Sequence, residues 1–73
     1  MKAQITYTFK TGLVLRAAPG VVTREELDEL INKTYSDVNS FTKFCLVDEN
    51  GDTHVLGEEL CKTMVITFKI IEE

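Results

Sequence analysis

The chain has 73 residues, 44% of them hydrophobic and 27% charged, so it is long enough for one small core and too short for two. No apolar run approaches the roughly 20 residues of a membrane-spanning helix, and residues 1–7 alternate polar and apolar side chains instead of resembling a signal peptide. Two cysteines are too few for a disulfide scaffold. We therefore expect a single cytoplasmic domain over residues 1–73, with no membrane partner.

The net charge of −4 is distributed unevenly along the chain. Residues 1–24 carry four basic side chains and no acid, whereas residues 25–73 carry twelve acids and four lysines. Such an asymmetry marks an interaction surface in some proteins and only a solvated surface in others, and both interpretations stay open at this point.

Residues 3–10 form the clearest strand of the sequence. Apolar side chains alternate strictly with polar ones, with the β-branched and aromatic bias of a half-buried strand. Thr11 and Gly12 supply a turn, and residues 13–18 form the returning strand. Pro19 and Gly20 end it, because proline lacks the N–H that a strand ladder needs. An N-terminal hairpin is predicted.

A helix is predicted over residues 24–36. Thr23 and Glu26 have the spacing of a capping box, and Val22 and Leu27 that of a hydrophobic staple. The helix would bury one apolar stripe. Its members are Leu27, Leu30, Ile31, Thr34 and Tyr35. Residues 36–40 are predicted to be a loop.

In the second half of the chain, a strand is predicted over residues 41–47, followed by an Asn-Gly turn over 48–52. Residues 53–56 are predicted to be a short return strand or, alternatively, only a loop. A last strand is predicted over residues 63–71. Residues 57–62 are ambiguous, with one helical turn as an option. The order β-β-α-β-β(-β) predicts an α+β fold in which one antiparallel sheet carries a single helix on one face.

One helix covers one face of such a sheet, so the other face is expected to be open. It would carry Val14, Ala18, Val65 and Ile71, together with one face of residues 41–47. These side chains are too apolar to form a contiguous patch in water. A homodimer, or a partner protein on this face, is the expected consequence.

The acidic turn resembles a calcium loop only in part. Asp48, Asn50, Asp52 and Glu59 fall at its positions 1, 3, 5 and 12, but Thr53 occupies the position that requires glycine, and the flanks are strands. We expect a polar turn and no metal or other cofactor.

Catalytic chemistry is not expected from the cysteines. Cys45 lies within an apolar strand and Cys61 next to one, the usual setting of inert buried thiols, although one pair with the single histidine, His54, is conceivable. We expect His54 at the surface. No phosphate-binding loop or nucleophile elbow is present, so we expect no catalytic residues and no enzyme.

A partner-binding role for the acids is the sharper expectation. Lys2, Lys10, Arg16 and Tyr7 would offer only a small basic patch on an acidic protein, so no direct nucleic-acid binding is expected. Carboxylates on a helix and an adjoining turn can instead imitate the phosphates of DNA toward a basic protein. The predicted partner-binding residues are Glu25, Asp28, Glu29, Asp48, Glu49 and Asp52.

The segment from Ile5 to Gly12, the turn from Val47 to Gly51 before a closing strand, and the short length give the chain a layout similar to short orphan proteins of phages and prophages. The resemblance implies a non-enzymatic inhibitor or modulator that binds a host protein in the host cytoplasm. It carries no residue roles. The alternative expectation is a structural or assembly protein that self-associates through its open sheet face.

Overall fold

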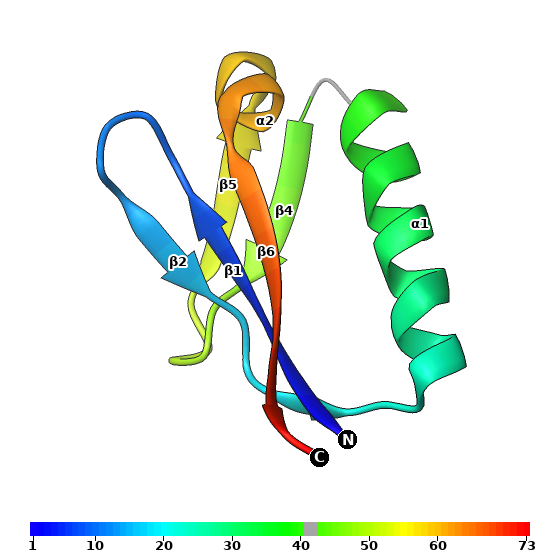
Figure 1. The fold of residues 1–73 in the computed structure, drawn as a ribbon. Helices are drawn as coiled ribbons and strands as arrows, with labels where there is room; N and C mark the ends of the chain where they lie inside the picture. Colours follow the sequence, from blue (N-terminus) through cyan, green and yellow to red (C-terminus); the bar gives the residue numbers. More distant parts are fainter. Residues whose placement is uncertain (41–42) are drawn as a thin grey trace.

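The computed structural model describes residues 1–40 and 43–73 (Figure 1). Within them the chain forms six strands and two helices, which confirms the α+β class. The predicted strand start at Phe41 lies outside the described residues. Neither helix in the described ranges is both long and apolar enough to cross a membrane.

The main sheet is built around its first strand, β1 (Lys2–Thr8). The last strand, β6 (Val65–Glu72), pairs with one edge of β1, and β2 (Val14–Arg16) and β3 (Gly20–Val21) pair with the two ends of its other edge, all antiparallel. The predicted N-terminal hairpin is confirmed, and Gly12 adopts the positive φ of 92° that its turn requires. β1 is therefore the central strand.

A second sheet holds the strands of the acidic turn. β4 (Lys43–Val47) and β5 (Thr53–Gly57) pair only with each other in the described part of the chain, and the helix α2 (Glu58–Thr63) follows directly. Gly51 supplies the turn with a φ of 86°. The predicted return strand at residues 53–56 is confirmed, whereas the expectation of one sheet is wrong, because two sheets form. Most of the ambiguous segment 57–62 belongs to the second helix, which extends from Glu58 to Thr63.

The longer helix, α1 (Arg24–Ser40), begins where its capping box predicts. The Glu26 N–H donates to Thr23 Oγ1 at 3.1 Å, and the Thr23 N–H donates to Glu26 Oε1 at 3.2 Å. The helix ends later than predicted, because residues 36–40 are helical and not a loop. Four of these five residues are polar, but they include neither glycine nor proline, so the helix has no strong breaker there.

The core lies between the two sheets. It consists of buried side chains from the first hairpin, the second hairpin and α2. They are Tyr7, Phe9, Leu15, Leu46, Leu56 and Cys61. Burial raises the pKa of the Tyr7 hydroxyl. The β4–β5 hairpin and α2 therefore cover much of the sheet face that the helix alone was expected to cover.

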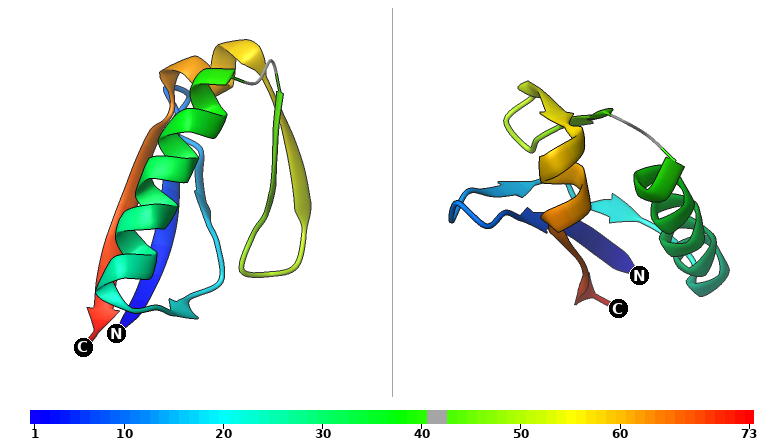
Figure 2. Two further views of the ribbon diagram at one scale, coloured as in Figure 1. Left: turned by 90° about the vertical axis from the view of Figure 1, so that its right-hand side faces the viewer. Right: turned by 90° about the horizontal axis from the view of Figure 1, so that it is seen from above.

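Because the hairpin takes this position, the predicted stripe of α1 is only partly buried. Leu27 is 4% exposed, but Ile31 is 39% and Tyr35 is 73% exposed. Figure 2 shows α1 as a separate element beside the two sheets, at a different part of the main sheet from the hairpin. The prediction that Ile31 and Tyr35 are buried is wrong.

The outer face of the main sheet is mixed rather than continuously apolar. Val14 and Val65 are exposed and flank Thr8 in adjacent strands, as expected. The next rows along β1 are polar, because Thr6 pairs with Thr67 and Gln4 with Lys69. The described part of the strand expected to extend this face, Lys43–Val47, lies in the other sheet. The face is therefore a weak candidate for a hydrophobic interface.

The capping box allows a direct test of the start of α1. Replacing Thr23 with alanine removes the acceptor for the Glu26 N–H and should cost about 1 kcal/mol of unfolding free energy, which lowers the Tm of a domain this small by about 4–8 °C. Thr23→Ser keeps the hydroxyl acceptor and is the matched control. Thermal melting followed by circular dichroism measures both; equal melting temperatures for the alanine and serine variants would contradict the capping role.

Candidate partner-binding surface

The acids of α1 form the first part of the candidate surface. Glu25, Asp28 and Glu29 are exposed, and their spacing of three and four residues places them on one face of the helix. Their carboxylates have no hydrogen-bond or ion-pair partner among the described residues, and Glu29 makes no salt bridge with Lys33. Glu26 differs, because its carboxylate is committed to the capping box. Three charges of this helix face therefore remain available to a partner.

The turn between β4 and β5 is organised by Asp48. Its Oδ1 accepts hydrogen bonds from the N–H groups of Asn50 at 2.9 Å and Asp52 at 3.0 Å, and its Oδ2 lies 2.7 Å from His54 Nε2. The hydrogen bond with His54, followed by the backbone donors, lowers the pKa of Asp48 below its ordinary value. Asp48 thus keeps its charge but uses its oxygens to build the turn.

Glu49 attaches this turn to the first hairpin. Its N–H donates to the Arg16 carbonyl at 2.7 Å, and its Oε2 accepts from Gln4 Nε2 at 2.9 Å. The same Gln4 nitrogen donates to the Ala17 carbonyl at 3.0 Å. Among the predicted binding residues of this turn, Asp52 is the one whose carboxylate has no partner in the described part of the chain.

The fold brings both acidic segments to one end of the molecule. Figure 1 shows the start of α1, the β4–β5 turn and both chain termini at its lower end, and the left view of Figure 2 agrees. The two segments stand apart at that end in both views. The six predicted residues therefore form two acidic groups, Glu25 to Glu29 and Asp48 to Asp52, and not one continuous cluster.

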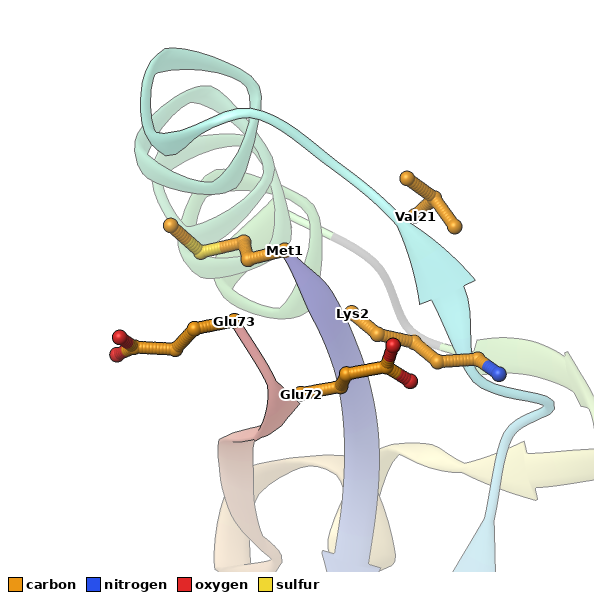
Figure 3. A pocket seen from close by; sticks show the side chains of 5 residues that line it. All are labelled: Met1, Lys2, Val21, Glu72 and Glu73. Carbon is orange, nitrogen blue, oxygen red and sulfur yellow. The ribbon is translucent and has the colours of Figure 1, made fainter.

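Two further acids at this end were missed from the sequence. Glu72 and Glu73, together with Met1, Lys2 and Val21, line an open hollow of about 300 Å³ (Figure 3). Glu72 lies on the same side of the strands as Lys2, its partner in the β1–β6 register, whereas Glu73 extends to the other side. Glu72 and Glu73 lie at this end because the last strand pairs with the first. The alternation of polar and apolar residues predicts each strand but does not reveal which strands pair.

The calcium-loop pattern does not assemble. Asp48, Asn50 and Asp52 share the turn, but Glu59 lies in α2, beyond the far end of β5. Five strand residues span about 17 Å, too far for one coordination sphere. No group of metal-ligating side chains occurs among the described residues.

The cysteines and the histidine do not form a catalytic pair. Cys45 faces Val55 across the hairpin and His54 faces Leu46, so Cys45 and His54 point to opposite faces. Cys61 is buried, its Sγ donates to the Leu56 carbonyl at 3.6 Å, and burial raises the pKa of this thiol. Cys45 is exposed, contrary to expectation, because it lies on the outer face of β4.

Comparison with protein families, with characterised proteins and with solved structures finds no match to this chain.

The organisation of the turn predicts a pH dependence of stability. Because the pKa of Asp48 is lower in the folded protein, its stabilisation is complete above the ordinary value of 3.8 and is lost as the pH falls through the folded pKa. Asp48→Ala should lower Tm at pH 7 and lower it by less at pH 3. Asp52→Asn, a change at a carboxylate without a described partner, is the control. A Tm difference between Asp48→Ala and the unsubstituted protein that is the same at both pH values would contradict this assignment.

Proposed function

We propose that this protein is a non-enzymatic binding protein that occupies a basic site on a host protein through its acidic end. The observation that carries the proposal is the group of predicted binding residues at that end whose exposed carboxylates have no partner among the described residues. These are Glu25, Asp28, Glu29 and Asp52. A carboxylate that makes no contact within its own chain keeps its full charge and its acceptor oxygens for a partner.

The charge spacing on α1 favours a partner that normally holds DNA. Residues 25 and 29 are about 6 Å apart along the helix axis. Three negative charges over that length approach the density of duplex DNA, which carries one charge per about 1.7 Å of axis. The α1 acids are also fixed on a capped helix, so little ordering is required on binding. Mimicry of DNA toward a basic DNA-binding protein is the specific form of the proposal.

The resemblance to phage and prophage proteins supports a role in a host cytoplasm, where the protein would block or redirect its target. The alternative role is assembly through the open sheet face. That role has less support, because polar rows containing Thr6, Thr67, Gln4 and Lys69 interrupt the exposed valines. Binding through the acidic end is therefore the function that the geometry supports best.

Charge reversal on α1 tests this proposal. The triple variant Glu25→Lys, Asp28→Lys, Glu29→Lys changes the charge of one exposed helix face by six units and breaks no ion pair of the described residues. Lysine in the first turn opposes the helix dipole, which costs about 0.3–1 kcal/mol, so a neutral triple variant with glutamine, asparagine and glutamine accompanies it. Circular dichroism verifies that both variants fold.

Binding is measured on proteins captured from a bacterial lysate by the immobilised chain and then purified. We expect the lysine variant to bind them at least tenfold more weakly, equivalent to about 1.4 kcal/mol, and the neutral variant to show an intermediate loss. Duplex DNA should compete for the same partner. Salt sensitivity without competition by DNA would retain the acidic surface but exclude DNA mimicry.

The matched control removes charge from the first hairpin instead. Lys2, Lys10 and Arg16 are exposed or half-buried basic residues, and their replacement with glutamine should leave binding intact. If this control loses the partner while the α1 variant retains it, the basic hairpin is the functional face and the proposal is wrong.

A further inference from the structure

The last strand leaves one edge of the main sheet open. β6 is 8 residues long, and within the described strands it pairs only with β1. The left view of Figure 2 shows β6 at one margin of the molecule, with α1 lying over the sheet next to it. An open strand edge presents a row of backbone N–H and C=O groups that can pair with another strand.

An apolar groove runs between this edge strand and α1. The groove has a volume of about 280 Å³. Its lining comes from α1, from the residue that precedes β6, and from β6 itself. The lining residues are Ile31, Thr34, Tyr35, Met64, Ile66 and Phe68. Ile31 and Tyr35 are the two side chains of the predicted buried stripe that the single chain leaves exposed. The open edge and the uncovered helix surface therefore adjoin each other.

We propose that a second copy of this chain occupies the edge, with β6 paired antiparallel to β6 across a twofold axis at Phe68. The main sheets of the two copies then form one continuous sheet. This interface goes beyond the binding function proposed above and uses a different surface. It also replaces the open sheet face as the route to the expected homodimer.

The inner row of β6 is self-complementary in this register. In an antiparallel pair, directly opposite residues lie on the same face of the sheet. A twofold axis at Phe68 places Phe68 opposite its own copy and Ile66 opposite Ile70 of the second copy. Each inward-facing position thus meets an apolar side chain. The partner's inner row lies about 4.8 Å beyond β6, where it extends the floor of the groove beneath Ile31 and Tyr35.

The charge pattern of the outer row selects the same register. With the axis at Phe68, Lys69 faces Thr67 of the second copy and no like charges meet. With the axis at Lys69, the lysine faces its own copy, which is unfavourable. With the axis at Thr67 or Ile70, only five residues of each strand overlap. The Phe68 register is the longest one without repulsion, and a lysine in the edge strand also discourages pairing in other registers.

Substitutions at Thr67 test the register through the sign of one charge. Thr67 is exposed on the outer face. Thr67→Lys places lysine opposite Lys69 twice in the dimer and should raise the dimer Kd about tenfold, whereas Thr67→Glu should lower it by a similar factor. Sedimentation equilibrium on the full chain measures each Kd as a change between the monomer mass of 8.3 kDa and twice that mass.

A charge swap completes the design. Thr67→Lys combined with Lys69→Glu places opposite charges across the axis again and should lower the Kd to about that of the Thr67→Glu variant. Circular dichroism verifies that each variant folds. A chain that remains monomeric at high micromolar concentration overturns the proposal. A dimer whose Kd is the same for the Thr67→Lys and Thr67→Glu variants also overturns it. The first outcome would leave the edge to a strand of a different protein.

Discussion

The antiparallel pairing of β1 with β6 is the constraint on which the rest of the structure depends. It joins the two ends of the chain and makes β1 the central strand of the main sheet. It also places Tyr7 next to Ile66 on the inner face, where both belong to or pack against the core. Everything between residues 9 and 64 must then fold back over this pair of strands.

Two segments share the task of covering the inner face. The β4–β5 hairpin and α2 supply Leu46, Leu56 and Cys61 to the core, and Glu49 fixes the hairpin turn to the Arg16 carbonyl. α1 buries Leu27 but leaves Ile31 and Tyr35 exposed. The uncovered part of α1 therefore follows from the placement of the hairpin, and the groove beside β6 is its result.

Local signals were sufficient for much of the fold. Alternation identified the first and last strands, glycine turns located both hairpins, and the Thr23–Glu26 pair fixed the start of α1. The end of α1 was missed because a mostly polar segment without glycine or proline carries no strong stop signal. The division into two sheets was missed because it depends on which strands meet in space, and alternation is the same for either arrangement.

For the candidate surface too, some features were predictable from the local sequence and others depend on tertiary contacts. Exposure of the α1 acids was predictable from helical spacing, whereas the structural roles of Asp48 and Glu49 depend on contacts with His54 and Gln4. Glu72 and Glu73 join the acidic end only because β6 returns alongside β1. Acids that look equivalent in the sequence are therefore divided by tertiary contacts into those that hold the turn and those that remain available.

The two proposed surfaces are physically compatible. Antiparallel pairing of β6 places the acidic end of one copy at the opposite extremity of the dimer from the acidic end of the other. In this register Glu72 of each copy lies opposite residue 64 of the other, so the two Glu72 positions are about 27 Å apart along the strands, whereas the Debye length at physiological ionic strength is about 8 Å. Repulsion between the acidic ends is thus screened, although each chain carries a charge of −4. The dimer would present two separate acidic ends, and a target with two basic sites would bind it with a gain in avidity that a monomer lacks.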